Sequence, residues 1–209
     1  MNYFAHAWIA SQIRPEPRFV LGSMLPDLLG FLRIRPPQES PAEVAAGMTL
    51  HHATDAVFHA LPGFREENQA GVRALLELGL RRGSARAASH VGIEFILDRA
   101  LAVDAGSWVA LYRSALAEHP CLRWASSPSA DAVSQMAERL TALDPSTPAE
   151  PAETAERIRR TLESRPRLAL RSGEQKPLEV WLSTITARLT PMSGELAQQT
   201  LHAVKRQRH

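Results

Sequence analysis

The segment from residue 40 to residue 60 reads Ser-Pro-Ala-Glu-Val-Ala-Ala-Gly-Met-Thr-Leu-His-His-Ala-Thr-Asp-Ala-Val-Phe-His-Ala, and it decides the class of the fold. Ser40 is a favoured N-cap residue, a proline follows at the first helical position, and Glu43 stands where the acid of a capping box belongs. We therefore expect a helix that runs from Pro41 to about Ala60.

The rest of the chain repeats this helical character. Ala, Leu and Arg dominate, and no run of alternating β-branched residues predicts a strand. The sequence therefore predicts an all-α fold, a single-domain helical bundle over residues 1–209, with an N-terminal half (1–103) that holds the candidate metal-site residues and a helical C-terminal part (104–209). The helix at residues 19–31 should break or kink near Pro26, which places Asp27 at a helix start or a kink. Gly83 should end the helix at 64–82, and Ser84 should cap the helix at 84–103. The other helices are expected at 3–13, 107–118, 130–143, 152–164, 176–189 and 193–206, with a Pro-rich loop at 144–151.

Composition narrows the function classes. The chain has 24 Lys and Arg against 22 Asp and Glu, a formal charge of +2 that does not call for nucleic acid as a partner. No apolar run approaches the roughly 20 residues that span a bilayer, and no charged leader precedes an apolar segment, so we expect a cytoplasmic protein. A single cysteine, Cys121, excludes a thiolate-rich zinc site, so any metal must be bound through imidazole and carboxylate groups.

Two imidazole–carboxylate pairs stand out. Residues four apart lie on one helix face, so His51 and Asp55 point the same way, and His90 and Glu94 repeat the arrangement on a second helix. Each series extends by one turn, to His59 and to Asp98. Apolar neighbours make both helices look buried, where an unpartnered carboxylate is costly. A metal site is one interpretation, and solvated helix faces with local hydrogen bonds are the other.

Other catalytic signatures are missing. The sequence has no nucleophile elbow, phosphate-cradling glycine loop or dinucleotide fingerprint, which sets aside serine hydrolases, nucleotide kinases and dehydrogenases. An arginine-rich stretch near residues 157–171 is interleaved with glutamates. It is interpreted as a solvated helix face, with contact to an acidic carrier protein or a phosphorylated ligand as the alternative.

Four segments together resemble a known family. They are the opening Met-Asn-Tyr-Phe-Ala-His-Ala-Trp-Ile-Ala, the segment Gly22-Ser-Met-Leu-Pro-Asp, the run from Gly47 to Asp55 with Pro-Gly-Phe-Arg after it, and Gly92-Ile-Glu-Phe-Ile-Leu-Asp-Arg-Ala-Leu-Ala. In order and spacing they resemble the acyl carrier protein phosphodiesterases over about the first 103 residues. The resemblance implies a helical fold related to HD-type phosphohydrolases. It also implies a divalent metal, typically manganese, that serves hydrolysis of the phosphodiester between phosphopantetheine and a carrier-protein serine.

The resemblance also assigns residues. His6, Asp27, His51 and Asp55 match family positions of the same type, Asp98 matches a second acid on the later helix, and Glu94 stands where the family has Asp. The chain differs in having His52 where the family tends to have Arg, Phe58-His59 in place of Thr-Asp, and Leu61 before the proline in place of His.

A second resemblance, to zinc-dependent phospholipases C and nucleases, rests on the same paired motifs and would make His59 a further nitrogen ligand. Both resemblances imply cleavage of phosphodiesters. A helical binding protein that has kept the fold without the chemistry is the competing class, because of the differences at His52, Phe58, His59 and Leu61.

We therefore expect a metal-dependent phosphodiesterase or phosphohydrolase. Manganese is the first choice of ion, with iron, zinc or magnesium as alternatives. Asp98 or His59 is expected to orient a ligand or the attacking water, and His52 to contact substrate. The expected ligands of one or two ions are His6, Asp27, His51, Asp55, His90 and Glu94.

Overall fold

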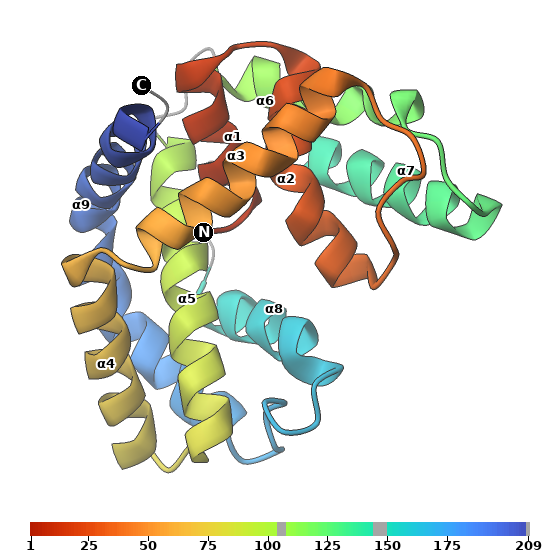
Figure 1. The fold of residues 1–209 in the computed structure, drawn as a ribbon. Helices are drawn as coiled ribbons and strands as arrows, with labels where there is room; N and C mark the ends of the chain where they lie inside the picture. The colour runs from red at the N-terminus through yellow and green to blue at the C-terminus, as the bar shows by residue number, and fades with distance from the viewer. Residues whose placement is uncertain (104–107, 144–149, 208–209) are drawn as a thin grey trace.

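The computed structural model describes residues 1–103, 108–143 and 150–207, and these residues fold into a single helical bundle (Figure 1). Strand-like pairing within these ranges is limited to one isolated bridge between Glu39 and Arg123. The predicted all-α fold is therefore confirmed, while most of the predicted 144–151 loop lies outside the described residues. The helices are α1 (Tyr3–Ile13), α2 (Pro17–Leu32), α3 (Ala42–Phe58), α4 (Pro62–Glu77), α5 (Arg82–Val103), α6 (Trp108–Ala117), the short 3-10 helix η1 (His119–Cys121), α7 (Ser127–Ala142), α8 (Pro151–Glu163) and α9 (Gln175–Gln207).

Two helices run through prolines at which the sequence predicts a break. α2 continues past Pro26, and α9 is one helix through Pro191 in place of the two helices expected at 176–189 and 193–206. Proline removes one hydrogen bond and favours a kink. Buried apolar residues flank both prolines, so tertiary packing outweighs that local preference.

The junction between α4 and α5 also differs from the prediction. α4 ends at Glu77 because Gly79 adopts φ +91°, a left-handed conformation suited to a helix C-terminus. The chain then enters α5 at Arg82, so neither the predicted stop at Gly83 nor the predicted cap at Ser84 occurs. The Ser84 hydroxyl is buried inside α5 and instead donates to the Ala169 carbonyl at 3.3 Å.

The hydrophobic core has two clusters. One lies among α4, α5, α8 and α9, and the other lies among α1, α2, α3, α6 and α7, which matches the two groups of helices in Figure 1. Trp8 and Ile13 of α1 pack against both. α1, α3 and α9 each contribute buried residues to both clusters and so join them. No helix in the described part of the chain is both long and apolar enough to cross a membrane.

Glycines bring α2 and α3 into close contact. A Cβ atom at Gly22 would collide with the Val44 carbonyl oxygen, and one at Gly47 would collide with the Phe19 carbonyl oxygen. Only glycine allows two helix backbones to approach this closely. The contact fixes the position of the α3 imidazoles relative to the α2 carboxylate.

Candidate metal centre

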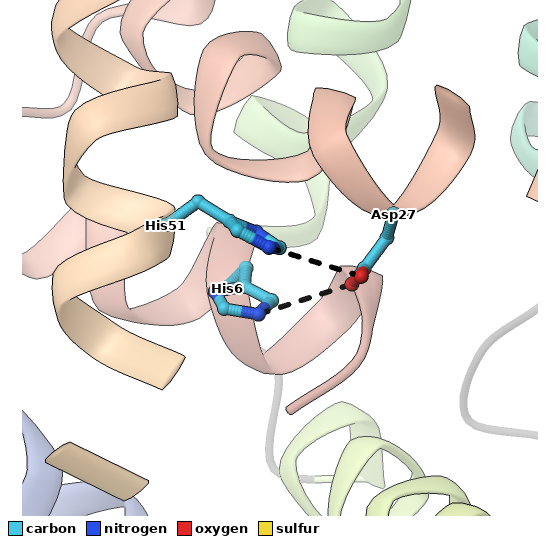
Figure 2. Close-up of side chains that lie close together, drawn as sticks. All are labelled: His6, Asp27 and His51. Atoms are coloured by element: carbon cyan, nitrogen blue, oxygen red, sulfur yellow. Dashed lines mark ion pairs between the residues drawn. The ribbon is translucent and has the colours of Figure 1, made fainter. Parts of the chain in front are cut away.

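The first candidate ligand group combines side chains from α1, α2 and α3. His6, Asp27 and His51 each offer an atom within 4.8 Å of the others. Each imidazole Nε2 lies 3.8 Å from an Asp27 oxygen, and Figure 2 shows both rings directed at that carboxylate. The two rings stack with centroids 3.9 Å apart. Three residues distant in sequence thus converge on one point, with Asp27 inside α2 and not at a helix start.

A backbone carbonyl fixes the protonation of His51. Its Nδ1 lies 2.9 Å from the Ser23 carbonyl oxygen, which can only accept a hydrogen bond. The neutral ring therefore carries its proton on Nδ1 and leaves a lone pair on Nε2, the atom directed at Asp27. Metal-binding histidines are held by second hydrogen bonds of this kind.

Asp55 links the first group to the second. Its Oδ1 lies 3.2 Å from His6 Nε2, and its Oδ2 lies 3.7 Å from His51 Nε2. The Met1 ammonium donates to Asp55 Oδ1 at 3.0 Å and to Glu94 Oε1 at 2.8 Å, which places the N-terminus between α3 and α5 (Figure 1). A positive charge between these two carboxylates marks the region as one that stabilises cations.

The second candidate ligand group is His59, His90 and Glu94, whose donor atoms also lie within 4.8 Å of one another. His59 Nε2 is 3.0 Å from Glu94 Oε1, and His90 Nε2 is 3.1 Å from the same oxygen. The His59 and His90 side chains are 32% and 37% exposed, against 0% for His6 and 4% for His51. This group therefore lies nearer the solvent.

Burial controls the charges of the first group. It lowers the pKa of His6, and it lowers that of His51 to about 3 with help from the neighbouring His6. Burial also raises the pKa of Asp27 well above its usual value. Both imidazoles are thus neutral at physiological pH, which is the form that binds a metal.

The linking carboxylates behave in the opposite way. Burial opposes ionisation of Asp55 and Glu94, but neighbouring histidines and the Met1 ammonium outweigh it and lower both pKa values. Burial likewise works against the Met1 ammonium, yet Glu94 and Asp55 raise its pKa to about 10. The two carboxylates are therefore ionised, and the Met1 ammonium offsets only one of their two negative charges.

Both groups adjoin a single cleft of about 530 Å³, within the size range of small-molecule sites. Asp27 from the first group and all three residues of the second group contribute to its lining, as does Asp55. The cleft is also lined by Arg33 at the end of α2 and, around the end of α8, by Arg160, Thr161, Glu163, Ser164 and Arg165. The C-terminal part of the chain therefore contributes to a site that the sequence prediction assigned to residues 1–103.

The predicted catalytic Asp98 lies away from this lining. Its Oδ1 accepts from the Ala5 amide at 3.0 Å and its Oδ2 accepts from the Phe4 amide at 3.3 Å, so it binds the first turn of α1. Those amides lie at a helix N-terminus, where a carboxylate is stabilising. Asp98 thereby positions the helix that carries His6.

The residues that differ from the family pattern lie in different environments: at the surface, in the hydrophobic core and in the second ligand group. His52 is exposed, outside the cleft lining, with its ring edge-on to His51 at 5.3 Å. Phe58 is buried in the core, and Leu61 packs partly buried against it. His59, predicted to be catalytic, joins the second ligand group. Sequence reasoning missed the Ser23 carbonyl and the Met1 ammonium, because main-chain groups leave no side-chain signature.

The residues present fit a divalent ion. In the first group His6 Nδ1 and Asp27 Oδ2 are buried and have no hydrogen-bond partner among the described residues. His6 Nε2 has carboxylate oxygens beside it, Asp55 Oδ1 at 3.2 Å and Asp27 Oδ2 at 3.8 Å. Buried polar atoms normally find partners because desolvation is costly. Imidazole nitrogens and carboxylate oxygens at this spacing are the donor set of manganese, iron and zinc sites.

Comparison with known families addresses the same region. Residues 1–79 match the family model of the acyl carrier protein phosphodiesterases. This match covers α1 to α4 and includes His6, Asp27, His51, Asp55 and His59. The resemblance inferred from the sequence is confirmed over these residues. No curated protein and no solved structure matches the chain.

Proposed function

We propose that the chain is a divalent-metal-dependent phosphodiesterase whose ligands are His6, Asp27, His51, Asp55, His90 and Glu94. The observation that carries the proposal is the convergence of buried His6 Nε2 and the unpartnered Asp27 Oδ2 with the lone pair on His51 Nε2. The match of residues 1–79 to a phosphodiesterase family supports the reaction type. The residues of the C-terminal part that line the cleft support treating residues 1–209 as one functional domain.

The residues have separate roles in this proposal. His6, Asp27 and His51 hold one ion, His90 and Glu94 hold a second, and Asp55 lies between them. A divalent ion supplies Lewis-acid activation of water and of the phosphoryl oxygen. His59 orients a ligand or the attacking water, and Asp98 orients α1. Manganese is the preferred ion, with iron, zinc and magnesium as alternatives.

The proposed substrate is a phosphodiester, with phosphopantetheinylated acyl carrier protein as the first candidate because of the family match. A zinc-dependent, phospholipase C or nuclease-like activity is the second candidate. It is favoured by one observation, the pairing of His59 with His90 in a nitrogen-rich ligand group. Zinc binds such imidazole-rich sets well.

Asp55→Asn tests the proposal. The amide keeps the size of the side chain but removes the charge between the two ligand groups, so turnover should fall about a hundredfold or more. The measurement is hydrolysis of bis(p-nitrophenyl) phosphate and of phosphopantetheinylated carrier protein, with manganese, iron, zinc or magnesium as the added ion. Both activities should fall together, because the change affects the ions and not the choice of substrate.

Asp131→Asn is the matched control, because Asp131 is an exposed α7 carboxylate outside the cleft lining. It should retain wild-type turnover. A wild-type protein that hydrolyses neither substrate with any of the four ions would refute the proposal in favour of a non-catalytic binding protein. Equal activity of Asp55→Asn and wild type would refute the assignment of the site.

A further inference from the structure

The cleft beside the metal-binding residues contains an arginine cluster that the proposed chemistry does not use. Arg33, Arg160 and Arg165 line it together with Asp55 and Glu94. They come from the C-terminal end of α2, from α8 and from the segment that follows α8. Hydrolysis of a phosphodiester at the ligand groups does not require these three guanidinium groups.

Arg33 occupies an unusual backbone position. It ends α2 with φ 56° and ψ 39°, which lies in the left-handed region. Among the described residues no other non-glycine residue has a positive φ. Glycine is far better suited to this helix-end conformation. An arginine in the place where glycine fits best points to a role for the side chain.

Two of these three arginines make no ion pair among the described residues, although Asp27, Asp55, Glu94 and Glu163 line the same cleft. Arg160 pairs with Glu156 at 2.8 Å, whereas no carboxylate in the described ranges of the chain pairs with Arg33 or Arg165. Gly30, also in the cleft lining, has open space where a Cβ would stand. Two unpaired guanidinium groups therefore border a roomy cleft.

We propose that Arg33 and Arg165, with Arg160 beside them, form an anion subsite for a second phosphoryl group carried by the substrate. Guanidinium groups bind phosphate oxygens in pairs of parallel hydrogen bonds. A phosphodiester carries one negative charge, so a terminal phosphoryl group would add the charge that this cluster attracts. The inference rests on the proposed function only in taking a phosphodiester as the group that is cleaved.

The position of the arginines favours a small phosphorylated group over an acidic protein surface. All three line the same concave cleft as the ligand groups. The three arginine side chains are exposed at the mouth of the cleft, but a group that reaches both them and the ligand groups must enter the cleft. Contact with an acidic carrier protein is therefore the competing outcome.

Titration with inorganic phosphate tests the subsite without turnover. Chelator-treated protein is used, so that bound metal does not contribute, and phosphate affinity is measured by calorimetry. Arg33→Gly, which suits the left-handed backbone, and Arg165→Gln should each weaken binding about tenfold. Arg35→Gln is the matched control, because it removes an exposed positive charge two residues away and outside the cleft lining. Its affinity should match the wild type, and equal affinities in all four proteins would overturn the inference.

A pair of substrates tests the role in recognition. The p-nitrophenyl ester of thymidine 5′-phosphate is compared with the same ester bearing a 3′-phosphate. In the wild type the added phosphate should lower KM about tenfold with little effect on kcat. This KM advantage should vanish in Arg33→Gly and persist in Arg35→Gln.

Two results distinguish failure of the proposed phosphodiesterase function from failure of the proposed anion subsite. If the wild type cleaves neither these esters nor bis(p-nitrophenyl) phosphate nor phosphopantetheinylated carrier protein, the proposed function fails, and the phosphate titration decides the subsite alone. If the arginine variants lose only affinity for phosphopantetheinylated carrier protein, while phosphate binding and the KM advantage stay unchanged, the cluster serves an acidic protein surface and the inference is overturned.

Discussion

The two candidate ligand groups differ most in their access to solvent. His6, Asp27 and His51 lie where three helices meet, and the tautomer of His51 is fixed by a carbonyl oxygen. His59, His90 and Glu94 lie nearer the solvent, and both imidazoles already contact Glu94. In the first group Asp27 Oδ2 has no partner among the described residues and the two imidazoles do not contact Asp27 closely, whereas in the second group both imidazoles must give up a contact with Glu94 to bind an ion.

This difference in access to solvent predicts that the two groups would hold their ions with different exchange rates. An ion in the first group would be shielded from water and held by preset donors, so it would dissociate slowly. An ion in the second would exchange more readily and lie within reach of a ligand in the cleft. The close approach of α2 and α3 through Gly22 and Gly47 is the physical source of the contrast.

The largest expected effect separates the two groups by metal content. His51→Ala removes a preset donor, so it should weaken binding of the tightly held ion by about a hundredfold or more. His90→Ala should weaken the other ion by only about tenfold, because its place is more open to water. Metal per chain is measured by mass spectrometry after dialysis against graded chelator.

His202→Ala is the control, since His202 is exposed on α9. It should retain the wild-type metal content. Equal metal loss in His51→Ala and His90→Ala would mean that the two groups behave as one site. Unchanged stoichiometry in both would show that neither group binds the ion.

The sequence predicts the helices and the local pairs better than the distant contacts. The spacing of His51 and Asp55 and of His90 and Glu94 follows directly from the helical period. By contrast, the meeting of His6, Asp27 and His51 depends on the packing of α1, α2 and α3. Such packing follows from backbone approach at glycines, which no single motif encodes.

Asp98 is a case in which local spacing alone does not determine the role, because a contact with a distant part of the sequence decides what the carboxylate binds. Its spacing from Glu94 predicts a shared face, and hence a catalytic or orienting role. Its carboxylate instead binds the amides of Phe4 and Ala5. α1 begins 95 positions earlier in the sequence than this acid, and only the fold brings the two together.

The second prediction concerns Asp98 and the pH dependence of stability. Burial raises the pKa of Asp98 from 3.8 to about 7, against the opposing effect of the Ala5 and Phe4 amides. The folded state therefore holds the proton more tightly than the unfolded state. The stability from this group is present below pH 4 and is lost as pH rises through about 7, by on the order of a few kcal/mol.

Asp98→Asn should remove this dependence, because an amide does not ionise in this range. Denaturant unfolding of chelator-treated protein between pH 4.5 and pH 8 measures the difference from wild type. Asp131→Asn should follow the wild-type profile, since that carboxylate is exposed. The variant should also weaken the ion of the first group more than that of the second, because Asp98 positions α1. Parallel wild-type and Asp98→Asn profiles would contradict the assignment.

The smallest expected effect comes from His52→Arg, which restores the residue type found in the resembling family. His52 is exposed and contacts the His51 ring edge-on, without lining the cleft. The change should alter the activity ratio between carrier protein and bis(p-nitrophenyl) phosphate about threefold, because the added charge lies at the surface. Metal content should stay at the wild-type level.

His59→Asp is the informative partner of that variant, since His59 belongs to the second ligand group and His52 to neither. Replacing its nitrogen with a carboxylate should shift the preference of the second group from zinc toward manganese. His52→Arg should leave this preference unchanged. If His52→Arg strips the ion as thoroughly as His51→Ala does, its ring contact is needed to hold His51. The first group would then extend to the exposed face of α3, and the contrast between a buried group and an open one would no longer hold.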